Sequence, residues 1–176
     1  GWLWIQSPIL IWIYAIVAFA LIFDVIAVVN RKHKSIVNEL VIFAAICLST
    51  PLAYGATTGS LSVEAMAIWV LNTLFFGSAI FTIKLRRKKT SSLKPGFVYH
   101  LIATIIVAGL FVLGWLKLVT TLAFAVVLIK FAVVISFRNW YQKAKFHSVA
   151  LLETRFAVIY IAIAAISVLP AHLPSA

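Results

Sequence analysis

The stretch Asp24–Leu40, DVIAVVNRKHKSIVNEL, decides the fold of this chain because it joins two apolar segments through a short basic loop. Asp24 lies in the first apolar segment and Glu39 in the second, with the cluster RKHK between them. Basic residues that follow an apolar span of about 20 residues are typical of the point where a transmembrane helix leaves the membrane. The stretch therefore predicts two membrane-spanning helices that are joined at one membrane surface.

The composition extends this prediction to the whole chain. Of its 176 residues, 64% are hydrophobic and 11% are charged, and the mean hydropathy is +1.12. A soluble domain of this size does not have such a composition. Because no polar block is long enough to form an independent unit, we expect residues 1–176 to be a single all-α domain, a polytopic helical membrane bundle.

Apolar spans of the length that crosses a bilayer occur about six times along the chain. We predict transmembrane helices near residues 8–29, 36–55, 65–85, 97–114, 116–137 and 149–169. The fourth connection, GWLK, is short enough to be a tight turn.

Lys and Arg are distributed unevenly among the predicted loops. The first, third and fifth connections hold twelve of them, the second holds none, and the fourth holds only Lys117. Because basic loops stay in the cytoplasm, this alternation predicts a bundle with both termini of this segment outside. The formal net charge of +11 then faces anionic lipid. The basic residues fall between apolar spans and form no aromatic-interleaved face, so we expect no nucleic-acid partner.

The start of the chain and its cysteine content add two expectations. The chain starts at Gly1 without the basic region and cleavage site of a signal peptide, so we expect upstream residues to be missing. If the native N-terminus is cytoplasmic, an odd number of helices precedes this segment. Cys47 is the only cysteine, which excludes an intrachain disulfide and a thiolate metal cluster and leaves the redox compartment undefined.

Charged residues inside the bilayer are costly and rare, so each of them is a candidate for a functional site. By helical rise, Asp24 lies about 9 Å and Lys130 about 12 Å from the cytoplasmic end of its helix. Glu39, Glu153 and Arg155 lie within roughly two turns of that end. The candidate substrate-binding residues, all in or next to the cytoplasmic half, are Asp24, Arg31, Glu39, Lys130, Glu153 and Arg155.

Two interpretations of these charges remain open. In a structural one, Asp24 pairs with Lys130 and Glu153 pairs with Arg155, while other Lys side chains extend to the headgroups. In a functional one, the basic residues bind an anionic head in a cavity open to the cytoplasm, and the acids orient it or accept a proton. Three acids on this side are few for a hard-metal site, so no metal site is predicted, and the residues leave the cofactor undefined. No nucleophile and base pattern predicts a catalytic residue.

Several motifs resemble the YwiC-like family of bacterial membrane proteins. They are NRKHKSIVNEL followed by AAICLSTPLAYGATTGSL, a helix that ends in IKLRR, and a last helix that begins SVALLETRFAVIY. The resemblance implies a multi-pass protein of a bacterial cytoplasmic-type inner membrane, with a thylakoid-type membrane as the alternative. The family's amino-terminal motif, of the Gln-His-Gly-Ala-Trp type, does not occur in this chain.

The layout of that family also resembles a shortened UbiA-type membrane prenyltransferase. Such enzymes hold magnesium and diphosphate with two Asp-rich motifs. Here DVIAVVNRKHKSIVNE keeps one acid, a basic loop and a second acid, but neither Asp-rich motif. An anion or lipid site is compatible with this departure, whereas magnesium-diphosphate catalysis is not supported.

Three functional hypotheses follow for an integral membrane protein of this kind. The first is binding, with or without modification, of an isoprenoid or lipid-like molecule that has an anionic head at the cytoplasmic side. The second is a noncatalytic accessory or assembly subunit of a larger membrane complex. The third, a small transporter, needs a polar path, for which the outer half offers only Glu64, Asn72, Thr120 and Thr121.

Overall fold

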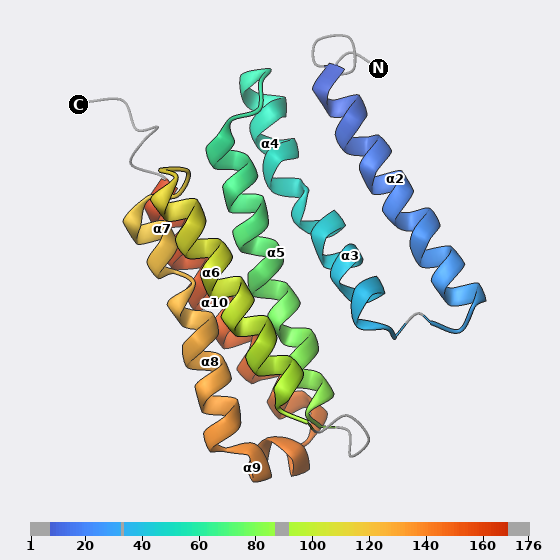
Figure 1. Ribbon diagram of the computed structural model, residues 1–176, viewed down its shortest axis with the longest axis vertical. Helices are drawn as coiled ribbons and strands as arrows, with labels where there is room; N and C mark the ends of the chain where they lie inside the picture. The colour runs from blue at the N-terminus through green and yellow to red at the C-terminus, as the bar shows by residue number, and fades with distance from the viewer. Residues whose placement is uncertain (1–7, 33, 87–91, 169–176) are drawn as a thin grey trace. The chain divides into compact units, whose positions relative to one another are not determined.

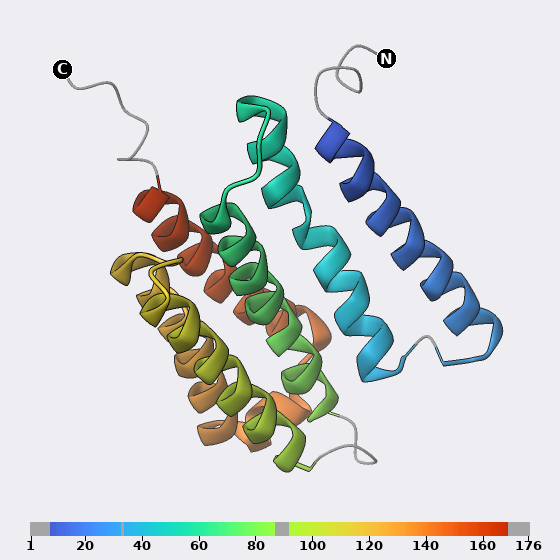
Figure 2. The ribbon, with the colours of Figure 1, turned by 45° about the horizontal axis from the view of Figure 1, so that its top comes forward.

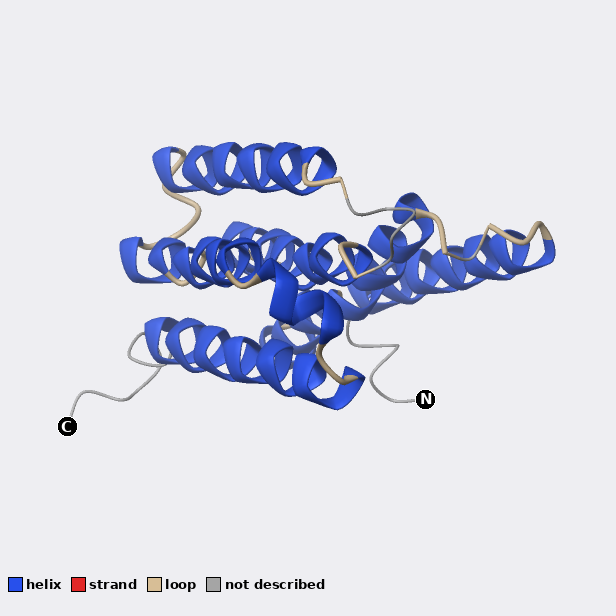
Figure 3. Ribbon diagram, turned by 90° about the horizontal axis from the view of Figure 1, so that it is seen from below, coloured by secondary structure: helices blue, strands red, loops and turns tan. Residues whose placement is uncertain are grey.

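The computed structural model describes residues 8–32, 34–86 and 92–168. Over these residues every regular element is a helix (Figure 3). The helices are α2 (Pro8–Val29), α3 (Ile36–Cys47), α4 (Ser49–Thr58), α5 (Val63–Lys84), α6 (Lys94–Val112), α7 (Leu118–Leu122), α8 (Ala125–Ser136), α9 (Arg138–Lys143) and α10 (Phe146–Val168).

Six helical segments of the described residues are long and apolar enough to cross a membrane. They are Ile11–Val29, Ile36–Thr58, Val63–Lys84, Lys94–Val112, Leu118–Ser136 and Phe146–Val168. The sequence prediction of a polytopic helical bundle with about six spans is therefore confirmed. The orientation with both termini outside stays a prediction.

The chain forms two compact units, residues 1–80 and residues 81–176, and the boundary falls inside α5. We call them the first unit and the second unit and describe each by itself. The expectation of a single domain stays a prediction.

In the first unit, α2 runs alongside α3 and α4 (Figures 1 and 2). Hydrogen bonds join the second span of this unit to α5: the indole Nε1 of Trp69 donates to the carbonyl of Ala44 at 2.8 Å, and Asn72 Nδ2 donates to Thr50 Oγ1 at 2.9 Å. Trp69 and Asn72, both on α5, therefore bond to the preceding span. Such bonds satisfy polar groups that have no water partner in the membrane.

The predicted helix over 36–55 consists of two helices, α3 and α4, with Leu48 between them. Pro51 explains the interruption, because proline has no backbone N–H to donate to the carbonyl four residues earlier and its ring crowds that carbonyl. The break lies twelve residues after the start of α3.

The second unit contains α6 to α10 and the end of α5. Part of its core is a cluster of four buried side chains, one from the residue after α5 and one each from α8, α9 and α10: Leu85, Val134, Tyr141 and Val149. Thr120 and Ser167 share a hydrogen bond of 2.8 Å, which joins α7 to α10. The expected tight turn after α6 is also present, and Gly114 has a φ of 74°, a left-handed conformation that glycine adopts without strain.

Two features of the second unit differ from the sequence prediction. The predicted helix over 116–137 is divided into α7 and α8, where Phe124 N donates to Thr121 O and Val127 N to Phe124 O, three residues back instead of four. The predicted loop RNWYQKAKFHS also contains a short helix, α9, which connects the ends of α8 and α10 (Figure 1). It was missed because six residues are too few to show a helical period.

Candidate functional site

The carboxylate of Glu153, on α10, is the centre of a buried polar cluster in the second unit. Lys130 Nζ, from α8, lies 2.8 Å from Glu153 Oε2. Thr82 Oγ1 donates to Glu153 Oε1 at 2.8 Å, and the Tyr141 hydroxyl donates to the same oxygen at 3.2 Å. Four helices, α5, α8, α9 and α10, therefore contribute to one charge-assisted hydrogen-bond cluster, which we call the Glu153 cluster.

The two charged side chains of the Glu153 cluster are largely buried, so their pairing affects the stability of the protein strongly. The Lys130 side chain is 1% exposed and that of Glu153 is 17% exposed. An unpaired charge at this depth is strongly unfavourable, whereas a paired and hydrogen-bonded one is tolerated. The Glu153 cluster thus neutralises Lys130 inside the unit and ties α8 to α10.

Tyr141 is the member of the cluster that lies outside the membrane-spanning segments. Burial raises the pKa of Tyr141 above its usual value, and the negative charge of Glu153 raises it further. The phenol therefore stays protonated at neutral pH and acts as a hydrogen-bond donor to Glu153.

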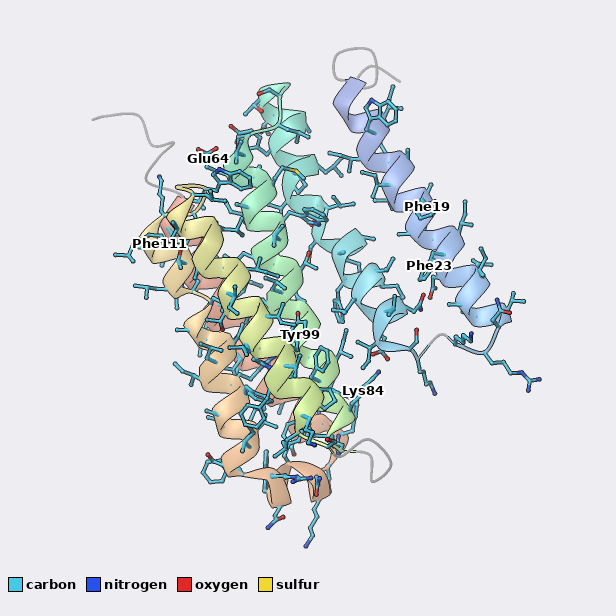
Figure 4. The ribbon with its side chains drawn as sticks, viewed as in Figure 1. Phe19, Phe23, Glu64, Lys84, Tyr99 and Phe111 are labelled. Carbon is cyan, nitrogen blue, oxygen red and sulfur yellow. The ribbon has the colours of Figure 1, made fainter. Side chains whose placement is uncertain are left out.

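His100, on α6 of the same unit, packs against aromatic side chains. Its Nδ1 lies 2.7 Å from the carbonyl oxygen of Gly96, so Nδ1 carries the proton and Nε2 holds a lone pair. The ring stacks on Phe131 at a centroid distance of 3.9 Å. Tyr99, labelled in Figure 4, meets His100 edge to face and stacks on Phe81. Among the described residues, Nε2 has no hydrogen-bond partner and His100 is 4% exposed.

The first unit holds a second polar contact, between α2 and α3. Asn38 Nδ2 donates to Asp24 Oδ1 at 2.7 Å, and Asn38 is buried. The start of α3 fixes this geometry, because the Ser35 hydroxyl caps the helix by accepting the backbone N–H of Asn38. Asn38 therefore supplies Asp24 with a donor inside the membrane.

The remaining candidates of the first unit lie near this contact. Glu39 follows Asn38 and is partly buried. Arg31 is exposed in the loop after α2, with a φ of 56°. Its N–H bonds to Val28 O and that of Lys32 to Ala27 O, the pattern of a Schellman motif that ends a helix.

The structure brings the six predicted site residues together only in part. Lys130 and Glu153 are in direct contact, while Arg155 is exposed on α10. The suggested pair of Glu153 and Arg155 is wrong: residues two positions apart on a helix point to different faces, and the carboxylate meets Lys130. The suggested pair of Asp24 and Lys130 would join the two units and stays a prediction, as does a cavity shared by the six residues.

Sequence reasoning missed three residues of these polar contacts. Thr82 and Tyr141 bind Glu153, and Asn38 binds Asp24. The signal for Asn38 was a polar residue in the first turn of a membrane helix, one position before Glu39. Thr82 carried no comparable signal, since threonine commonly bonds to its own helix.

The acids of these contacts do not match the magnesium-diphosphate chemistry that the UbiA-like layout implies. In the part of the chain that the structure describes, no three His, Cys, Asp or Glu residues gather where they could hold a metal ion. Both oxygens of Glu153 already accept hydrogen bonds from side chains. The arrangement is suited to holding helices together, and no metal-dependent step follows from it.

A comparison with protein families supports the classification that the motifs suggested. The family model described as YwiC-like protein matches residues 1–54. The YwiC-like classification is confirmed over this segment. The match covers α2, α3 and the start of α4, and so includes the contact between Asp24 and Asn38. Comparisons with curated proteins and with solved structures find no match.

Proposed function

We propose that this YwiC-like membrane protein binds an isoprenoid or lipid-like molecule whose anionic head lies at the cytoplasmic side. The proposal concerns binding, because the polar contacts described above hold helices together and indicate no reaction. The observation that carries it is the uneven distribution of charge between the two units.

The first unit holds three Lys and Arg residues against three acids, so its formal charge is balanced. The second unit holds twelve against one. That single acid is Glu153, which is bound to Lys130 inside the unit. The excess positive charge of the chain therefore belongs to the second unit.

Most of the Lys and Arg residues that the structure describes in the second unit lie at one end of it, six of nine: Lys84, Arg86, Lys94, Arg138, Lys143 and Lys145. The chain order brings together the end of α5, the start of α6, the end of α8 and the start of α10. Gln142 Nε2 donates to Leu85 O at 3.0 Å, which joins α9 to the residue that follows α5. The exposed basic residues of this end include Lys94, Lys143 and Lys145. A basic surface next to apolar helices attracts an amphiphile with a negative head.

The test is native mass spectrometry of the purified protein in a mild detergent, combined with lipid analysis of the same sample. We expect a reproducible, stoichiometric anionic amphiphile to remain bound. A protein that retains no amphiphile and instead co-purifies with a large membrane complex would contradict the proposal and favour the accessory subunit.

A further inference from the structure

We infer that the segment Phe137–His147, here called the α9 elbow, is a built binding site for the phosphate headgroup of an anionic phospholipid. The inference rests on the proposed function and adds where the head binds and which residues hold it. The alternative for the same charges is a diffuse attraction that depends on net charge alone. A built site needs an anchored backbone around its basic residues, whereas diffuse attraction does not.

Three side-chain hydrogen bonds fix the elbow to the rest of the second unit. The Tyr141 hydroxyl donates to Glu153, and Gln142 Nε2 donates to the carbonyl of Leu85. Arg86, two residues after the end of α5, donates to the carbonyl of Ala144. The Arg86 guanidinium also lies over the Phe146 ring, 6.0 Å from its centroid. The backbone on both sides of Lys143 is thus held in place.

The exposed side chains of the elbow include both aromatic and basic residues. Phe137 is 63%, Trp140 48% and Phe146 72% exposed. Lys143 and Lys145 are exposed between the last two of these. Tryptophan prefers the depth of the headgroups, phenylalanine buries its ring at the boundary with the acyl chains, and nearby lysines are attracted to anionic lipid. The combination fits a membrane surface better than it fits a soluble anion, which has no apolar part for the rings to contact.

The charge of the elbow favours phosphate. No acidic residue occurs between Phe137 and His147, whereas Arg138, Lys143 and Lys145 lie in this segment. Lysine binds phosphate oxygens through charge-assisted hydrogen bonds. An anchored backbone lowers the entropy lost when such side chains bind a headgroup. The binding should therefore depend on the anchors as well as on the lysines.

The experiment compares binding of phosphatidylglycerol and phosphatidylcholine to the whole protein by native mass spectrometry, with lipid titrated into the detergent. The charge variant is Lys143→Gln/Lys145→Gln. Its control is Lys117→Gln, which removes an exposed lysine in the turn between α6 and α7. The anchor variant is Gln142→Ala, which leaves the charge unchanged. Circular dichroism checks that each variant keeps its helix content.

We expect the double variant to weaken phosphatidylglycerol binding by about 30-fold. Each lysine near an anionic lipid surface strengthens binding roughly five-fold, and the variant removes two lysines. Gln142→Ala should weaken it several-fold, and Lys117→Gln should change it little. The built site would be overturned if Lys117→Gln weakened phosphatidylglycerol binding as much as the double variant does. It would also be overturned if Gln142→Ala bound phosphatidylglycerol as tightly as wild type. Complete competition by inorganic phosphate would assign the elbow to a soluble anion and would also overturn it.

Failure of the inference is distinguishable from failure of the proposed function. If wild type and all variants bind phosphatidylglycerol equally and more tightly than phosphatidylcholine, the head binds elsewhere and only the inference is wrong. If the wild-type protein prefers neither lipid and retains no other anionic amphiphile, the proposed function is wrong as well.

Discussion

At the scale of single residues, Lys130 depends on Glu153 for its place in the membrane. We expect Lys130→Met to lower the free energy of unfolding less than Glu153→Gln does. Methionine removes the buried positive charge, whereas Glu153→Gln leaves the Lys130 ammonium buried without a negative partner. Breaking a buried pair in this way typically costs about 3–5 kcal/mol. The measurement is thermal unfolding in detergent by circular dichroism.

The controls for this pair are a double variant and a distant acid. Lys130→Met/Glu153→Gln should regain most of the stability lost in Glu153→Gln, because no charge is left unpaired. Glu64→Gln should change little, since Glu64 is exposed. If Glu153→Gln unfolds at the same temperature as wild type, water hydrates Lys130 and the cluster is not a structural pair.

Arg31 is a residue whose backbone conformation favours another amino acid. Its φ is 56°, and a residue with a Cβ loses about 1–2 kcal/mol in the left-handed region. We therefore expect Arg31→Gly to raise the unfolding temperature. Gly114→Ala, at the equivalent position of the Schellman motif after α6, should lower it. A loss of stability in Arg31→Gly would mean that the arginine side chain makes a contact worth more than the strain.

Single residues also show what the sequence could and could not predict about the site. Lys130 and Glu153 were predicted to be candidate site residues, because a charge in an apolar span is costly unless it is paired, hydrated or bound to a ligand. Their pairing was not predicted, because it depends on how far each helix is rotated about its axis. Thr82 and Tyr141 were missed for the same reason, and the exposure of Arg155 on α10 became visible only in three dimensions.

At the scale of helices, α6 and α8 approach closely at Gly96. A Cβ added there would lie 3.0 Å from Phe131 Cε2 and Cζ, closer than carbon atoms pack without strain. We expect Gly96→Ala to destabilise the protein by about 1–3 kcal/mol through this overpacking. Thermal unfolding in detergent measures it.

The same helix provides a matched control for Gly96. Gly109 also lies in α6, but a Cβ there meets nothing within 4 Å. Gly109→Ala should therefore raise stability by about 0.5–1 kcal/mol, the usual gain from replacing a helical glycine. Adding Phe131→Leu to Gly96→Ala should restore part of the loss. Equal effects at the two glycines would show that the contact with Phe131 is unimportant.

Helix existence was easier to predict than helix continuity. The six spans follow from the length of apolar segments, which the bilayer thickness requires. The break between α3 and α4 had a visible cause in Pro51, whereas the break between α7 and α8 arises from a local tightening of backbone hydrogen bonds. Both breaks leave a helix of twelve residues next to a basic connection, α3 in one unit and α8 in the other.

At the scale of the whole molecule, the alternation of basic loops makes a topological prediction that can be tested directly. A cysteine at Ser60, between α4 and α5, should react with an impermeant thiol reagent from outside the cell. A cysteine at Ser92, next to the basic connection before α6, should react only after the reagent reaches the cytoplasm. Both serines are exposed, and the native Cys47 is 5% exposed, so it should give little background. The physical reason is that basic loops are retained on the cytoplasmic side.

In the six-helix arrangement a single span, Val63–Lys84, separates the two positions. Reaction of both cysteines from the same side would therefore mean that this span does not cross the membrane, and the six-span topology would be wrong.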